Sequence, residues 1–298
     1  MSPHARKDTV MPTFDTPQPI AATVEVYVGD VRITAGDRTD TTVEVRPSDP
    51  HSEIDVRAAE QTRVEYAAGR LLVKAPKPRG LAMFGRSAPS VDVEIGLPTG
   101  SHLRGDAGVG AFHGAGTFGA VKIKTGAGDV HLDNTATLDI NTATGAVVIG
   151  TVAGSAEVTT ASGTIRVGAF GADATVKNSN GETRIGTVDG ELRVNAANGD
   201  ILVDHARAGV TASTANGNVR IGAVSRGAVT LRTSAGWLEV GIARGTAAYL
   251  DLHTSFGKVR SDLDTSGAPE AGEQSVEVKA RTSFGDITVR RSELGEAA

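Results

Sequence analysis

The chain has 298 residues and a net charge of −5 that is spread along the sequence, which gives no electrostatic reason to expect nucleic acid as a partner. It contains no cysteine, which excludes disulfides and thiolate chemistry. Aromatic residues make up only 4% and glycine contributes 37 residues, so the composition favours thin, regular layers over a thick core built around large rings.

The N-terminal part of the chain is predicted to be β-rich but irregular. It has no apolar run of signal-peptide length, and no later stretch could cross a bilayer, so we expect a cytoplasmic protein. We expect residues 1–12 to be a disordered extension and residues 13–104 to form a cap with the first coils. Alternating apolar residues predict strands in this cap around residues 24–28, 31–33, 43–45, 54–56, 64–66, 71–74 and 91–97.

The segment from Lys74 to Ser90 is long for a connection in a compact domain, which is typical of a functional or a disordered loop. Its tip carries apolar side chains between basic ones. We predict that this tip contacts an anionic membrane surface or a groove of a partner protein. The alternative is that the tip folds back to cover the open end of the solenoid. The residues that would make the contact are Lys77, Arg79, Leu81, Met83, Phe84 and Arg86.

Residues 105–291 contain an internal repeat. The glycines that open successive units are eighteen residues apart, at Gly163, Gly181, Gly199 and Gly217. The unit that ends before Gly236 has one residue more. Such a period is typical of a solenoid, in which each unit is too small to bury its apolar face and stacks on copies of itself. A polar insertion between Val259 and Val276 is predicted to bulge from an otherwise continuous stack, and residues 292–298 are expected to be a flexible tail.

Two short strands are predicted within each unit. In the unit that starts at Gly163, Ile165 and Val167 alternate with the outward Arg166, and a second strand follows half a unit later. The bend that closes several units reads Asn-Gly, which tolerates positive φ but is also a hairpin signal. We prefer stacked two-strand coils over a hairpin meander, because equivalent positions keep their residue type every eighteen residues rather than every nine.

The sixteenth position of the unit is small and mostly carries a hydroxyl group. In stacked parallel coils, equivalent positions of successive units lie on top of one another. We therefore expect these side chains to form a column just inside a corner, with hydrogen bonds from coil to coil. The column consists of Thr125, Thr142, Thr160, Asn178, Ala196, Thr214, Thr233, Thr254 and Thr282.

Several segments resemble a known family. They are TFDTPQPIAATVEVYVGDVRITAG near the start, LPTGS at residues 97–101, and the repeated TGAGDV, TASGTI, TANGNV and TSFGDI. From about Thr13 to Arg290 the chain resembles the bacterial putative-adhesin repeat family, also called the toastrack domain. The resemblance implies a right-handed β-solenoid without a known catalytic site that acts as an interaction platform. Members are often attached to membrane segments and are associated with envelope-stress sensing or surface adhesion.

Residues that could carry chemistry are scattered. Asp139 and Glu157 are predicted to be neighbours on one outward face without a Lys or His at a matching position, and we interpret them as a solvated surface rather than an acid–base pair. His113 and His131 are predicted to stack about 5 Å apart. A metal ion bound by these two histidines would still need a third ligand. His205 is predicted to lie at a surface turn.

Two further groups are interpreted as structural. An outward column of arginines could dock an anionic polymer, but acidic residues on the same stretch are expected to neutralise it. The arginines are Arg166, Arg184 and Arg220, interrupted by Leu202, and the acidic residues are Glu157, Glu182, Asp189 and Glu191. Phe256 and Phe284 are expected to lie against each other, joined by Trp237, as a plug at the C-terminal end.

The chain is thus predicted to be all-β, a right-handed parallel β-solenoid with about 18 residues per coil and a less regular β-rich N-terminal cap. The expected function is a non-catalytic interaction scaffold with an unknown protein partner and a peripheral contact with an anionic membrane at its cytoplasmic face. No catalytic residue, metal site or cofactor is predicted. The alternatives are a self-assembling filament or end-to-end oligomer, and a carbohydrate-binding or carbohydrate-cleaving β-helix. The carbohydrate alternative is disfavoured because the sequence offers no carboxylate cluster and no surface aromatics for stacking on sugar.

Overall fold

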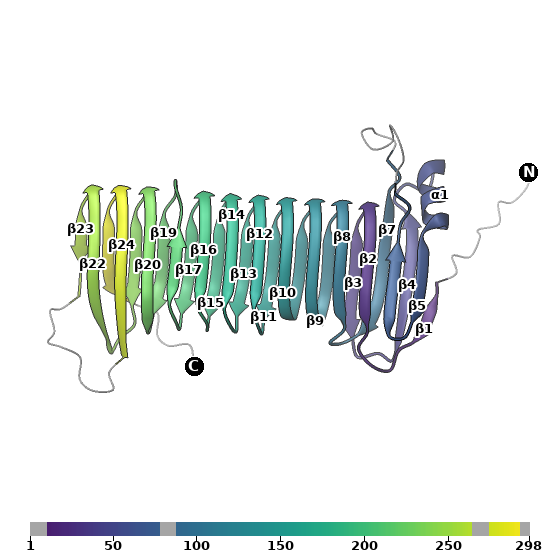
Figure 1. Ribbon diagram of the computed structural model, residues 1–298, viewed down its shortest axis with the longest axis horizontal. Helices are drawn as coiled ribbons and strands as arrows, with labels where there is room; N and C mark the ends of the chain where they lie inside the picture. Colours follow the sequence, from purple (N-terminus) through teal and green to yellow (C-terminus); the bar gives the residue numbers. More distant parts are fainter. Residues whose placement is uncertain (1–10, 78–87, 264–273, 293–298) are drawn as a thin grey trace, which may run out of the picture. The chain divides into compact units, whose positions relative to one another are not determined.

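The computed structural model describes residues 11–77, 88–263 and 274–292 (Figure 1). The chain divides into two compact units, Met1–Asp133 and Asn134–Ala298. In both units, most strands pair in parallel with the equivalent strands of the neighbouring coils. The predicted parallel β-solenoid is confirmed.

The first unit contains the one α-helix found in the described part of the chain. Its elements are β1 (Thr13–Asp15), β2 (Ala21–Val28), β3 (Val31–Gly36), β4 (Asp40–Pro47), α1 (Glu53–Gln61), β5 (Arg63–Ala67), β6 (Arg70–Lys74), β7 (Val91–Pro98), β8 (His102–Val109), β9 (Phe112–Ala127) and the first residues of β10 (Val130–Thr144). Inward apolar side chains alternate with outward polar ones, as in β3, where Val31 and Ile33 are buried on either side of the exposed Arg32.

The irregular cap is built from antiparallel pairs. β4 pairs antiparallel with β1 and β7, and β5 pairs antiparallel with β6. β2 lies between β6 and β8, and β3 lies between β7 and β9, all in parallel. The coil that comes first in the sequence is therefore covered by later strands, which protects its edge.

The helix α1 replaces a strand that the sequence pattern predicts around residues 54–56, so this prediction is wrong. Ser52 caps the helix, because its side chain accepts a hydrogen bond from the backbone N–H of Asp55 at 3.3 Å. The buried Asp55 carboxylate in turn accepts a hydrogen bond from the backbone N–H of Ser90 at 3.0 Å. These polar contacts, rather than the apolar pair Ile54 and Val56, decide the local conformation.

The second unit contains the regular coils. Its strands are the remainder of β10, β11 (Val147–Val152), β12 (Ala156–Ser162), β13 (Ile165–Phe170), β14 (Ala174–Asn180), β15 (Thr183–Val188), β16 (Leu192–Asn198), β17 (Ile201–Ala206), β18 (Val210–Ser213), β19 (Val219–Val224), β20 (Gly227–Ala235), β21 (Leu238–Ile242), β22 (Thr246–Phe256), β23 (Val259–Ser261), β24 (Gln274–Phe284) and β25 (Ile287–Arg291). The predicted register of eighteen residues is confirmed, since Ile165 pairs with Thr183 and Thr183 with Ile201. Each coil thereby covers the apolar face of the next.

The predicted column of hydroxyl side chains lies inside a corner of the coils, but its hydrogen bonds go to backbone carbonyls rather than to one another. Thr233 Oγ1 donates to the carbonyl of Gly217 in the neighbouring coil at 2.9 Å. Asn178 Nδ2 donates to the carbonyl of Gly163 at 3.0 Å. Thr233 and Asn178 therefore supply donors for carbonyls at the glycine bends, which would be costly to leave unpaired, whereas the buried Thr160 Oγ1 has no hydrogen-bond partner among the described residues.

The last coils of the second unit are stacked out of sequence order (Figure 1). β24 pairs with β20 on one side and with β22 on the other, and β25 pairs likewise with β21 and β23. The predicted continuous stack is wrong here, because the chain forms the outer coil β22–β23 first and then returns to insert β24–β25 beneath it. Most of the connecting insertion, residues 264–273, lies outside the described residues. Side-chain polarity agrees with this order, since Ser261 of the outer coil stands where β25 has the buried Val289.

Candidate functional site

Two carboxyl groups in the first unit are held ionised by arginine partners. A hydrogen bond that Arg38 donates to Asp40 at 2.8 Å holds the pKa of that carboxyl below its ordinary value. Hydrogen bonds from Arg46 lower the pKa of Glu44 in the same way. A lowered pKa suits an ion pair rather than a general acid, which has to hold its proton near neutral pH.

Asp139 and Glu157 are neighbours across β10 and β12, as predicted. The prediction that no lysine lies near them is wrong, because Lys177 Nζ is 3.0 Å from Glu157 Oε1. The two carboxylates line an open hollow of about 640 Å³ together with Asp173, Glu191, Arg193 and neighbouring residues. Charges of both signs share this surface, which is typical of a solvated ion-pair face.

The rings of His113 and His131 in the first unit are parallel, with centroids 5.1 Å apart, which confirms the predicted stacking. The parallel strands β9 and β10 hold them at the spacing of neighbouring coils. Over the residues that the structure describes, no group of three His, Asp or Glu side chains could hold a metal ion.

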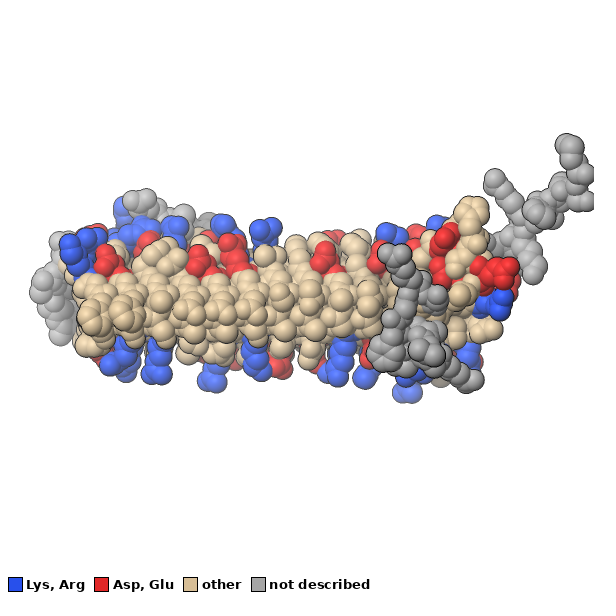
Figure 2. All heavy atoms as spheres, turned by 90° about the horizontal axis from the view of Figure 1, so that it is seen from above, with Lys and Arg blue, Asp and Glu red and all other residues tan. Residues whose placement is uncertain are grey.

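The arginine column also lies as predicted, since β13, β15, β17 and β19 place Arg166, Arg184, Leu202 and Arg220 side by side. Its ion-pair partners differ from those predicted. Arg184 lies 3.7 Å from Asp204 and Arg220 lies 3.5 Å from Glu239, both on neighbouring coils. Figure 2 shows, over the second unit at its left, a broad uncharged band between two charged margins. Because Arg184 and Arg220 are paired with acidic residues, the arginine column does not form a free basic stripe.

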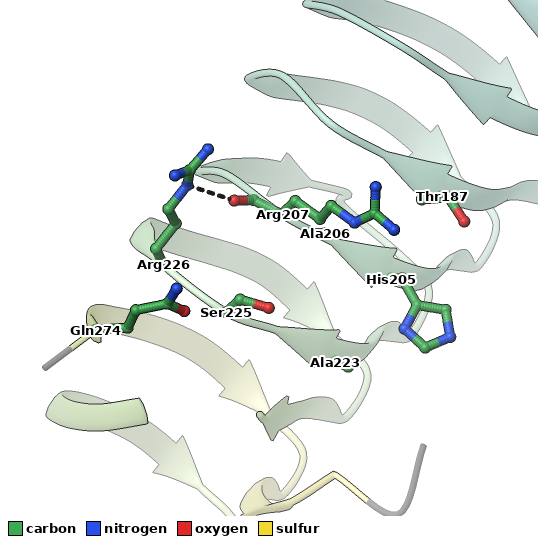
Figure 3. A pocket seen from close by; sticks show the side chains of 8 residues that line it. All are labelled: Thr187, His205, Ala206, Arg207, Ala223, Ser225, Arg226 and Gln274. Carbon is green, nitrogen blue, oxygen red and sulfur yellow. Dashed lines mark hydrogen bonds between the residues drawn. The ribbon is translucent and has the colours of Figure 1, made fainter. Parts of the chain in front are cut away.

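A small hollow lies in the second unit at the bends that lead into β18 and β20, at the corner of the coils away from the column of hydroxyl side chains (Figure 3). Its volume is about 230 Å³. His205 belongs to it and lies at the end of β17, so the predicted surface turn is wrong at this residue. The lining residues are Thr187, His205, Ala206, Arg207, Ala223, Ser225, Arg226 and Gln274. The sequence signal that could have located it is the one extra residue in the coil before Gly236.

The aromatic residues near the end of the second unit are on the surface. Phe256 and Phe284 pair in register, and their rings stack with centroids 5.0 Å apart, which confirms the predicted contact between them. Their exposed fractions are 66% and 58%, and Trp237 is also exposed, so the interpretation as a plug is wrong. The prediction that surface aromatics are lacking is wrong as well.

The outer coil exposes positions that every coil beneath it buries. Leu250 of β22 is 37% exposed and Val259 of β23 is 46% exposed, whereas their neighbours Val278 and Ile287 are fully buried. In the described residues, β22 pairs only with β24, and β23 only with β25. Over the described residues, the end of the second unit is therefore an apolar sheet edge whose outer backbone groups have no strand partner.

The predicted contact loop can be placed only in part. Lys77 is exposed after the end of β6. The other residues of the prediction, Arg79, Leu81, Met83, Phe84 and Arg86, lie outside the described residues. Among the described residues, no helix has the length and apolar character needed to span a membrane.

A family model described as Toastrack DUF4097 matches residues 21–290. The chain belongs to this Toastrack family. The match covers both units and confirms the resemblance found in the repeat motifs. A search of the curated proteins found no match to this Toastrack chain.

Solved structures similar to this Toastrack chain come from several bacteria. One is a putative adhesin from Bacteroides fragilis, 12% identical, with 94% of this chain and 96% of that chain covered and a TM-score of 0.36. Another is a putative lipid binding protein from Parabacteroides distasonis, 11% identical, with 95% and 96% covered and a TM-score of 0.40. A third is a putative cell adhesion protein from Clostridium sporogenes, 10% identical, with 94% and 98% covered and a TM-score of 0.23.

Proposed function

We propose that this protein is a non-catalytic interaction scaffold that binds an extended segment of a partner protein along the edge strand β22. The observation that carries the proposal is the outer coil of the second unit, where Leu250 and Val259 are exposed at positions that are fully buried in the coil beneath. Large exposed apolar side chains that lie together on a soluble protein are typical of an interaction site.

A protein segment suits this edge better than a sugar or a lipid. β22 is eleven residues long, and its side away from β24 carries backbone donors and acceptors at the spacing of a strand. Only another polypeptide can pair with these groups in register while its alternate side chains cover Leu250 and Leu252. The exposed rings of Phe256 and Phe284 stand at the end of the same strands and would extend the contact.

The proposal predicts that a synthetic copy of β24, QSVEVKARTSF, binds to the protein, because β24 already pairs with the other side of β22. Binding of the labelled peptide is measured by fluorescence anisotropy, with a scrambled peptide as reference. The double variant Leu250→Lys and Val259→Lys should bind at least about tenfold more weakly, because pairing would bury two ammonium groups.

Tyr249→Lys is the matched control, since Tyr249 is exposed beside Glu277 on the outward face of the same strand. This variant should bind the peptide like the wild type. Equal loss in both variants, or equal binding of the scrambled peptide, contradicts strand pairing. Light scattering is run alongside, because a concentration-dependent dimer that the double variant abolishes would show that the edge serves a second copy of the chain, the end-to-end alternative.

We also propose a cytoplasmic location with peripheral contact to an anionic membrane, as in the envelope-stress role that the family resemblance implies. The support is the sequence of the loop after β6, where apolar residues stand between basic ones. The wild type should co-sediment with anionic but not with neutral liposomes. Changing Leu81, Met83 and Phe84 to Ser should abolish this binding. If the folded wild type does not co-sediment with anionic liposomes, the proposed membrane contact is contradicted.

A further inference from the structure

The hollow at the bends before β18 and β20 owes its shape to an irregularity of the repeat. Three residues separate the paired positions Ala206 and Val210, whereas four separate the next pair, Val224 and Val229. The extra residue enlarges the bend at Ser225–Gly227, where Gly227 has a φ of +91° that favours glycine. The next coil in the stack is the inserted one, which begins at Gln274 instead of continuing from a bend. The regular stacking of bends therefore stops at this point.

Among the described residues, the lining of this hollow contains hydrogen-bond donors and no carboxylate. Two arginines, one histidine, one serine and one glutamine are among its eight residues. Arg226 donates from Nε to the carbonyl of Arg207 at 2.9 Å, which fixes the guanidinium at the edge of the hollow (Figure 3). Within the described part of the chain, no acidic side chain lies within ion-pair distance of Arg226, whereas Arg207 is bound to Asp189 at 3.1 Å. Arg226 thus brings to the site a positive charge that no described acidic residue compensates.

The arrangement in Figure 3 suits a compact anion. Arg226, Ser225 and Gln274 lie together at one end of the lining, and His205 stands at the other. Their guanidinium, hydroxyl, amide and imidazole groups can all donate hydrogen bonds. A volume of about 230 Å³ is below the usual size of pockets for drug-sized ligands, so it fits a ligand of few atoms.

We propose that this hollow is a binding site for a phosphate group. A planar guanidinium that is oriented by its own Nε hydrogen bond can direct its terminal nitrogens at two oxygens of one phosphate. Ser225 and Gln274 supply neutral donors beside it, and an anionic ligand is favoured because no carboxylate in the described lining competes for these donors. The site is separate from the edge strand β22 and goes beyond the proposed scaffold function.

Isothermal titration calorimetry at low ionic strength tests the proposal with three probes: inorganic phosphate, glycerol 3-phosphate and acetate. Phosphate should bind with one site per chain, and Arg226→Gln should weaken binding at least about tenfold, because a charge-assisted hydrogen bond is lost. Arg226→Lys keeps the positive charge but lacks the planar guanidinium that can bind two oxygens at once. Its affinity for phosphate should therefore lie between those of the wild type and of Arg226→Gln. Tighter binding of glycerol 3-phosphate would assign the site to a phosphate ester, and tighter binding of inorganic phosphate to the free ion.

Arg232→Gln is the control variant, because Arg232 is exposed on β20, carries the same charge and does not line the hollow. Its phosphate affinity should equal that of the wild type, and circular dichroism should show that all variants are folded. Equal weakening by both glutamine variants would overturn the proposal, since it would show a general effect of net charge. Absence of phosphate binding, or equally tight binding of acetate, would also overturn it.

Discussion

Changing Gly199 to alanine is expected to lower the free energy of unfolding of the second unit by roughly 3 kcal/mol or more. Gly199 has a φ of +138°, which side chains rarely adopt, and an added Cβ would lie 2.2 Å from the carbonyl oxygen of Gly181 in the neighbouring coil. The contacted atom belongs to the backbone of a stacked coil and cannot turn away. The coils would have to separate where they are held by hydrogen bonds. Urea denaturation followed by circular dichroism measures the effect.

Gly245→Ala is the matched control for this prediction. Gly245 also has a positive φ, of +76°, but an added Cβ would meet no atom within 4 Å. In the control variant, the free energy of unfolding should therefore fall only by the conformational cost of a positive φ, about 1 kcal/mol. If both variants lost the same amount, backbone strain alone would account for the glycine column, and close approach of the coils would not.

Ending the chain after Ser261 is expected to release two coils, although only one is deleted. The truncation removes β24 and β25, which are the described neighbours of β22 and β23. The outer coil then has no partner, and β20 and β21 lose the cover of the deleted coil. Val276, Val278, Ile287 and Val289 are fully or almost fully buried. We therefore expect the free energy of unfolding of the second unit to fall by roughly 5 kcal/mol. Hydrogen exchange should show that the amides of Thr246–Phe256 lose their protection.

Cutting the chain between residues 264 and 273 with an inserted protease site is the control for the truncation. The cut separates β23 from β24 in sequence but leaves the inserted coil in the molecule. Protection of β22 should then persist. If the truncated chain kept β22 protected, β22 and β23 would have to rest directly on β20 and β21 in that variant, and the expected release of the outer coil would be wrong.

The exposed edge shows why the candidate site was difficult to predict. Leu250 and Val259 have the same residue types and the same strand pattern as buried positions in other coils, so the sequence alone indicates that they are core. They are exposed because another segment occupies the inner place in the stack. The phosphate hollow has the same origin, since Gln274 reaches Ser225 only through the insertion of β24.

Local spacing was sufficient for much of the fold. The glycine period predicted the coil length, alternation predicted most strands, and like-on-like stacking predicted the contacts of His113 with His131 and of Phe256 with Phe284. These features depend on residues within one coil and on a constant shift between coils, both of which are written in the sequence. The repeat motifs also predicted the Toastrack family, which the match over residues 21–290 confirms.

The sequence by itself thus determined the repeating coil, its register and its inward face. Only the tertiary structure decided the order of the coils at the end of the second unit, the helix at Glu53–Gln61 and the ion-pair partners on the outer surface. The physical reason is that many coils have nearly the same inward pattern and could each cover another. Which coil lies outermost depends on small differences in non-local packing, such as Ser261 in place of Val289, and such differences have no periodic signal along the chain.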